Sequence, residues 1–120
     1  MKFRYIKLTS KSILTIIFLI IISIYSCSNE TKFDAKKWKS YGASESTHFV
    51  RWPMIHDLVK NYNLIGMSRK DVFLLLGEPI MKSSYNISYD LGPTGIGVNY
   101  GVLELIVSDE KIIKYLIIEH

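Results

Sequence analysis

The chain has 120 residues, of which 48% are hydrophobic and 22% charged, with 15 Lys and Arg against 11 Asp and Glu and a single Cys. This length is typical of one small domain and excludes a multidomain enzyme. A formal net charge of +4 would favour a nucleic-acid partner if it lay on a folded surface. The excess is entirely N-terminal, because residues 27–120 contain 11 basic and 11 acidic side chains. We therefore expect no nucleic-acid partner.

Residues 1–26 have the order of an export signal. Four basic residues and no acidic ones occur in this segment, an apolar run extends from Ile13 to Ile22, and serines follow. Secretory signals combine a cationic start, an apolar segment of about 7–15 residues and small residues before the cleavage point. The alternative is an uncleaved membrane-spanning helix. Such a helix needs roughly 20 apolar residues, whereas the stretch from Ser12 to Cys27 has 16 with several hydroxyls.

The end of this segment, Ile24-Tyr25-Ser26-Cys27, resembles the lipobox of bacterial lipoproteins, with an aliphatic residue at −3 and a small one at −1. The resemblance implies cleavage before Cys27, a diacylglycerol on its thiol and a further acyl chain such as palmitate. A lone Cys is otherwise a buried apolar residue, but Cys27 lies between an apolar and a polar run, where no core forms. Two or three acyl chains, at about 0.8 kcal/mol per buried methylene, anchor a protein stably in a membrane. With its only Cys lipidated, the chain forms no intramolecular disulfide.

The mature chain divides into a predicted tether and a predicted domain. Residues 27–46 comprise the lipidated Cys and a segment rich in Ser, Lys and Glu, which predicts a flexible tether. Its lysines either contact anionic headgroups or keep a solvated spacer open. Residues 47–120 contain 36 hydrophobic residues out of 74, and we expect one domain near the lower size limit for a fold without staples.

Two helices are predicted at the start of this domain. Apolar residues recur at helical spacing in residues 53–62, with Pro at a tolerated first-turn position. A second helix begins at Ser68, whose N-cap role is supported by Asp71 three residues on. Gly77 and Pro79 end that helix.

Three strands follow the helices. Residues 85–91 alternate between apolar and polar side chains, and residues 102–107 and 112–119 form a hairpin with a turn at 108–111. The predicted fold class is α+β, with two N-terminal helices packed on a three-stranded antiparallel sheet in the order ααβββ.

The last strand is apolar on both of its faces. Ile113, Tyr115 and Ile117 are expected on one side, and Leu116 and Ile118 on the other. Helices on one face of a sheet do not require the second face to be apolar. Either an unforeseen element covers that second face, or the face is a partner surface.

The glycine-rich loop at 92–97 is the other candidate contact site. Its spacing is not a dinucleotide fingerprint, because a strand follows it rather than a helix. Its apolar residues either tuck under the core or contact a partner. Together with a residue of the neighbouring strand, they form the predicted partner surface: Ile96, Val98, Tyr100 and Ile106.

No pattern in the sequence predicts catalysis or a metal site. Asp90 and Glu104 are candidates for a glycosidase pair across two strands, but so small a domain has little room for a water-excluding cleft. Ser68 lies in a helix cap and not in a nucleophile elbow. Three histidines are too dispersed for zinc spacing: His48, His56 and His120. We expect no enzyme, no cofactor and no metal.

The segment 64–79 resembles the "GMT-x-x-x-V-x-x-x-LG-x-P" signature of the SmpA/OmlA (BamE-like) family of small bacterial lipoproteins. Tyr89-Asp90-Leu91-Gly92 resembles a "Y-x-LG" variant of the aromatic first strand in related lipoproteins. The residues that carry the signature are structural in the family: Gly66, Met67, Ser68, Val72, Leu76, Gly77 and Pro79. Two family features are missing here, the Tyr, Asp and Gln-Gly motif before the first helix and the W-x-Y pattern of the first strand.

This resemblance implies a helix-on-sheet domain, similar in layout to half of a β-lactamase-inhibitor protein, that is tethered to a membrane and works by protein contact. Known members are accessory subunits of the outer-membrane β-barrel assembly machine, and they bind its other subunits and phosphatidylglycerol. We expect an exported, lipid-anchored, non-enzymatic accessory or scaffold protein of a bacterial envelope. Ser28 replaces the Asp typical of inner-membrane retention, which favours a Gram-negative outer membrane. A periplasmic inhibitor or small-ligand-binding module is the alternative.

Overall fold

The computed structural model describes residues 11–21, 31–95 and 97–120. The predicted lipid attachment site Cys27 and the predicted contact residue Ile96 lie outside these described residues. Residues 11–21 are helical. In the described ranges no helix combines the length and the apolar character needed to cross a membrane.

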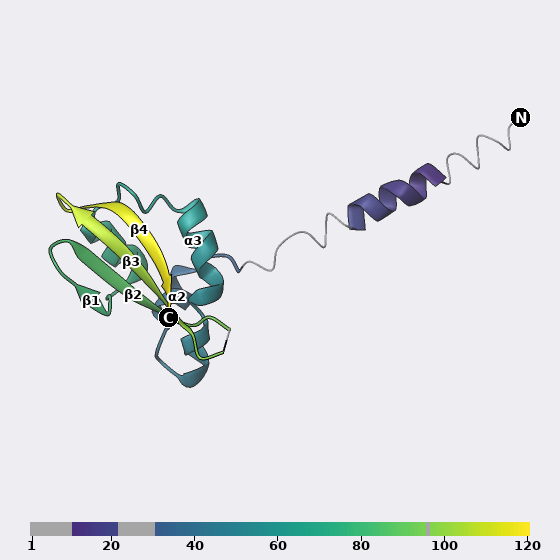
Figure 1. The fold of residues 1–120 in the computed structure, drawn as a ribbon. Helices are drawn as coiled ribbons and strands as arrows, with labels where there is room; N and C mark the ends of the chain where they lie inside the picture. Colours follow the sequence, from purple (N-terminus) through teal and green to yellow (C-terminus); the bar gives the residue numbers. More distant parts are fainter. Residues whose placement is uncertain (1–10, 22–30, 96) are drawn as a thin grey trace, which may run out of the picture.

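The described residues form an antiparallel sheet of four strands in the order β1-β2-β3-β4 (Figure 1). The strands are β1 (Met81–Lys82), β2 (Asn86–Pro93), β3 (Tyr100–Ser108) and β4 (Lys111–Glu119). The predicted α+β class with an antiparallel sheet is confirmed. The predicted count of three strands is wrong, because β1 was missed. A strand of two residues is too short to show an alternating pattern.

Helical segments pack on one face of this sheet (Figure 1). In chain order they are α2 (Ala35–Lys39), the 3-10 helices η1 (Glu45–Phe49) and η2 (Trp52–Met54), α3 (Ile55–Asn61) and α4 (Arg69–Leu76). The helices α3 and α4 were predicted from the sequence. The order of the described elements also contains α2, η1 and η2 before them, so the predicted pair of helices is incomplete.

The residues predicted to begin and end α4 have these roles in the structure. Ser68 caps the helix, since its Oγ accepts a hydrogen bond from the backbone N–H of Asp71 at 3.1 Å. Val72 and Leu76 are fully buried in the core. Gly77 ends the helix with φ +80°, a left-handed conformation that favours glycine.

A tight hairpin connects β3 and β4. Asp109 and Glu110 have φ of 50° and 61°, as a two-residue turn of the primed type requires. The pairing then shifts between Ile106 and Val107, which leaves one extra residue on β4. This bulge takes Ile113 out of the alternation, so its side chain is 54% exposed. The prediction that Ile113 lies on the same side of the last strand as Tyr115 and Ile117 is therefore wrong.

The folded domain starts earlier than predicted. In residues 31–46, which were predicted as a flexible tether, Asp34 caps α2, Trp38 is fully buried and Phe33 is 8% exposed. The ring centroid of Phe33 lies 5.7 Å from that of Trp38 and 4.8 Å from that of Tyr62. The polar composition of the segment predicts a flexible chain, whereas two of its aromatic residues, Phe33 and Trp38, are buried in the core. The tether prediction is wrong for these residues, and the domain begins near Phe33.

Asp57 of α3 fixes the start of this segment. Its carboxylate accepts hydrogen bonds from the backbone N–H of Phe33 at 2.7 Å and from the side-chain amide of Asn61 at 2.6 Å. These two donors, the Phe33 N–H first, hold the pKa of Asp57 below its usual value. The chain is thereby attached to α3 immediately before α2 begins.

We predict that Trp38→Ala lowers the free energy of unfolding by about 3–5 kcal/mol, the usual cost of deleting a large buried aromatic side chain. Lys36→Ala, on the exposed side of the same helix, is the matched control and stays within about 0.5 kcal/mol of wild type. Urea unfolding of the full chain in detergent, followed by circular dichroism, measures both. Equal stability of the two variants would show that α2 is not part of the folded domain.

Candidate partner surface

The face of the sheet away from the helices, here called the outer face, carries apolar and polar side chains on different strands. The register places Val102 beside Ile118 and Glu104 beside Leu116 across β3 and β4. Leu116 is 37% exposed, and the other two apolar side chains are half-buried. On β2 the corresponding positions are polar: Asn86, Ser88 and Asp90. Among the described residues no helix covers this face (Figure 1). The first predicted alternative, a covering element, is therefore not seen in this part of the chain, and the second, a partner surface, stays a prediction.

The predicted loop residues extend this surface at one end of the sheet. Val98 is 91% exposed and Tyr100 is 51% exposed, so the described part of the loop does not tuck under the core. Thr94 holds the base of the loop, because its N–H donates to Asn99 O at 3.0 Å and its Oγ1 donates to Glu119 Oε1 at 2.7 Å. Val98 and Tyr100 are therefore displayed together on an anchored loop.

Ile106 lies apart from these loop residues. It shares the outer face of β3 with Tyr100, and six residues of extended strand separate the two positions by about 20 Å. Its neighbours across the sheet are Asn86 on β2 and Lys114 on β4. The predicted partner surface is thus spread along the full length of β3.

The two candidate carboxylates do not form a pair. Glu104 lies opposite Ser88, whereas Asp90 lies opposite Val102. Each carboxylate also has its own hydrogen-bond donor, because the amide of Asn86 donates to Glu104 and the Tyr41 hydroxyl donates to Asp90 Oδ2 at 2.8 Å. The two carboxylates are thus diagonal neighbours, each held by a separate hydrogen-bond donor.

Arg51 is a buried charged residue of the domain, and no pattern in the sequence predicts its burial. It is 6% exposed, and its guanidinium carbon lies 4.8 Å, 4.3 Å and 5.8 Å from the ring centroids of Trp38, Tyr41 and Tyr89. Its Nε donates to Trp38 O at 3.0 Å and its Nη1 to Asp90 O at 2.8 Å. Burial lowers the pKa of Arg51. The side chain joins α2 to β2 by cation–π contacts and two charge-assisted hydrogen bonds.

Tyr41 and η1 cover the edge of β2 where β1 is absent. The hydrogen bond from Tyr41 to Asp90 holds the loop after α2 against this edge, and the backbone N–H of Gly92 donates to Asp90 Oδ1 at 3.2 Å. Burial, followed by the hydrogen bond to Asp90, raises the pKa of Tyr41 to about 12. A Cβ on Gly92 would collide with the backbone oxygen of His48, so the chain passes very close to the sheet here.

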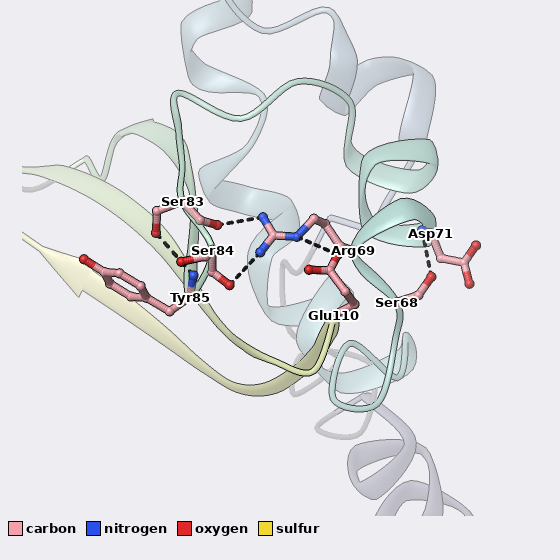
Figure 2. Close-up of polar contacts among 7 residues, drawn as sticks. All are labelled: Ser68, Arg69, Asp71, Ser83, Ser84, Tyr85 and Glu110. Atoms are coloured by element: carbon pink, nitrogen blue, oxygen red, sulfur yellow. Dashed lines mark hydrogen bonds and ion pairs between the residues drawn. The ribbon is translucent and has the colours of Figure 1, made fainter.

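Arg69, at the start of α4, connects three segments (Figure 2). Its Nη1 and Nη2 donate to the backbone oxygens of Ser83 and Ser84 at 2.7 Å and 2.9 Å, and its Nε lies 3.2 Å from Glu110 Oε2. A shallow groove of about 350 Å³ lies beside it, lined by Arg69, Lys70, Phe73, Leu74 and Glu110. Through these hydrogen bonds and this ion pair, the guanidinium connects α4 to the β1–β2 loop and to the β3–β4 turn.

The family-like motif has a visible structural role. Gly66 has φ +91° and donates its N–H to Ile112 O at 2.7 Å, while the N–H of Ile112 donates to Met67 O at 2.9 Å. The motif segment therefore pairs with the first residues of β4 before Ser68 starts α4. Pro79 follows the helix in the connection to β1.

The described residues contain no group of three or more His, Cys, Asp or Glu side chains placed to hold a metal ion. The three histidines are exposed and belong to separate segments: His48, His56 and His120.

No family model matches the chain, and neither a curated protein nor a solved structure matches it significantly. The resemblance to the SmpA/OmlA family therefore stays a prediction.

The raised pKa of Tyr41 predicts a pH dependence of stability. A hydroxyl whose pKa is higher in the folded chain contributes stability that is complete below its ordinary pKa of 10.0 and is lost as the pH rises to about 12. We expect the free energy of unfolding to fall more steeply over this range in wild type than in Tyr41→Phe, which keeps the ring against Arg51 but has no ionisable hydroxyl. Urea titrations at a series of pH values measure the difference, and identical slopes would contradict the assigned burial of Tyr41.

Proposed function

We propose that this chain is an exported, lipid-anchored lipoprotein of a bacterial envelope that acts as a non-enzymatic accessory or scaffold protein. It contacts an envelope protein through the outer face of its sheet and the neighbouring loop. The observation that carries this proposal is the open outer face, whose apolar side chains on β3 and β4 no described helix covers. An uncovered apolar face rimmed by polar groups is typical of a protein interaction site.

The composition of the surface supports a protein partner. Its apolar members are flanked by charged side chains at Asp90, Glu104 and Lys114, and an aromatic ring, Tyr100, lies half-exposed at one end. Interfaces combine an apolar centre containing aromatic residues with a polar rim, and a stable one covers about 800 Å² per partner. Extending the surface onto Val98 enlarges the area available for contact.

The anchor and the early start of the domain limit where the partner lies. Five residues separate Cys27 from Phe33, the first buried residue. A fully extended chain of this length spans about 20 Å, so a domain lipidated at Cys27 stays beside the bilayer. The short spacing supports a partner in or on the same membrane, and Ser28 after the Cys favours the Gram-negative outer membrane.

The motif supports membership of the SmpA/OmlA (BamE-like) family, with its helix-on-sheet layout similar to half of a β-lactamase-inhibitor protein. In this chain the motif's residues cap a helix, end it and pair with β4, which fits their structural role in that family. A part in outer-membrane barrel assembly follows from the same resemblance.

The experiment places a photo-crosslinking amino acid at Val98 in the full chain in living Gram-negative cells that also receive a palmitate analogue. The matched control position is His56, which is exposed on the helical side. We expect a crosslink to a membrane-resident envelope protein from position 98 and none from position 56. We expect palmitate labelling in wild type and its loss in Cys27→Ala.

Two results would contradict this proposal. Labelling that persists in Cys27→Ala would show that the anchor is not at that residue. Capture of a soluble enzyme from position 98, with no membrane-resident partner, would favour the periplasmic inhibitor.

A further inference from the structure

The two edges of the sheet are treated differently by the chain. Along the part of β2 that β1 does not pair with, Arg51 and Tyr41 cover the edge, and both donate hydrogen bonds to Asp90. The edge of β4 is paired only at its start, where the segment 66–68 bonds to Ile112. Across residues 113–119 the described chain places no backbone partner on this outer edge.

The register identifies the backbone groups that are open. Tyr100 and His120 exchange both backbone hydrogen bonds, at 3.1 Å and 2.9 Å. Hydrogen-bonded and non-bonded pairs alternate in an antiparallel ladder, so even-numbered residues of β4 bond to β3. The N–H and C=O groups of Tyr115, Ile117 and Glu119 therefore point away from the sheet.

The end of α3 and the loop at 62–65 lie beside Tyr115 on this edge, but they form no backbone hydrogen bonds with residues 113–119, and the strand itself carries few features that prevent strand pairing. Natural edges carry prolines, repeated lysines or covering loops, whereas residues 113–119 have Lys114 and Glu119 as their only charges and no Pro. Leu116 and Ile113 are 37% and 54% exposed on it. An open apolar edge of this length is a template for an extended strand of another chain.

We propose that the occupant is a second copy of this chain, with β4 paired antiparallel to β4 about a two-fold axis at Ile117. This inference goes beyond the proposed function, since the pairing needs neither the lipid anchor nor an envelope partner. It produces one continuous sheet across both copies, with the outer faces on the same side.

Hydrogen bonding selects this register. With Ile117 opposite itself, Tyr115 lies opposite Glu119, so every open backbone group on both strands finds a partner. An axis at Tyr115 requires Lys111 on each strand, where segment 66–68 already pairs. It also leaves backbone groups at the far end unpaired. An axis at Leu116 would pair Glu119 with Ile113, the extra residue of the bulge. The axis at Ile117 is therefore the two-fold arrangement that pairs the three open residues with one another.

The side chains are also self-complementary in this register. On the outer face Leu116 lies opposite Ile118 of the second copy, an apolar cross-strand pair that contributes roughly 0.2–1 kcal/mol on each side of the axis. Lys114 lies opposite His120, and Glu119 opposite Tyr115, so no acid faces an acid and no lysine faces a lysine. The outer faces of the two copies then form a single surface, because the apolar positions of β4 meet at the axis.

The test uses the full chain in detergent, with its mass measured by light scattering after size-exclusion chromatography. We expect wild type to be dimeric. The double variants L116K/I118K and L116E/I118E each place like charges opposite one another across the axis, and we expect the dimer to weaken at least tenfold in both. Co-expression of the two should restore a mixed dimer, because Lys then faces Glu. M81K, an exposed outer-face position on β1, is the matched control and stays dimeric.

The mixed dimer also shows that both double variants fold. As a second measurement, Leu116→Cys with Ile118→Cys in a Cys27→Ala background should give a covalent dimer on oxidation, and Met81→Cys in the same background should not. A monomeric wild type, failure of the Lys and Glu variants to recombine, or the absence of the covalent dimer would each overturn the proposal. Dimerisation of the Cys27→Ala chain separates this result from the anchoring experiment.

Discussion

The guanidinium of Arg51 lies between the rings of Trp38, Tyr41 and Tyr89 and donates hydrogen bonds to the backbone oxygens of Trp38 and Asp90. A buried charge costs several kcal/mol unless nearby groups compensate for its lost hydration. The compensating groups here come from α2, from the loop after it and from β2. None of them faces the guanidinium unless the whole arrangement has formed, so this one side chain couples the N-terminal segment to the sheet.

Several features of the domain depend on this coupling. Small domains often depend on a disulfide or a bound metal ion for stability. In this domain the aromatic cluster around Arg51 and Phe33 attaches the N-terminal segment to the sheet instead. It closes the edge of β2 and places the helical segments on one side of the sheet. Among the described residues Trp38 Nε1 is buried without a protein hydrogen-bond partner, and the aromatic rings packed around the indole offset part of the cost of that N–H. The cluster does not reach the outer face or the edge of β4.

Regular elements were predictable from the sequence because their signals are local. The helices α3 and α4 have helical spacing and clear caps, β2 shows alternation over several residues, and β3 and β4 are apolar runs on either side of a turn. The missed elements depend on distant contacts instead. Five residues of α2 become helical around Trp38, which is buried by residues from the rest of the domain. The bulge at Ile113 follows from pairing with β3, and no pattern in the neighbouring sequence predicts it.

The candidate site was predictable to a similar extent. Val98 and Tyr100 could be named as candidates, but their exposure could not be inferred, because apolar residues of a loop can either enter the core or remain at the surface. The distance between these residues and Ile106 could not be inferred either, because it depends on the length of β3. Arg51 was missed because a single basic residue in a sequence carries no information about the three rings that surround it.

Native-state hydrogen exchange tests most directly whether the segment from Phe33 to Trp52 is an integral part of the domain. The backbone N–H of Trp38 donates to Asp34 O at 2.8 Å in a helix that Arg51 attaches to the sheet. We predict that this amide in the full chain exchanges only through global unfolding, with the same opening free energy as the amides of β2 and β3. Exchange of the Trp38 amide at the rate of an unstructured chain, while β2 and β3 remain protected, would contradict the account.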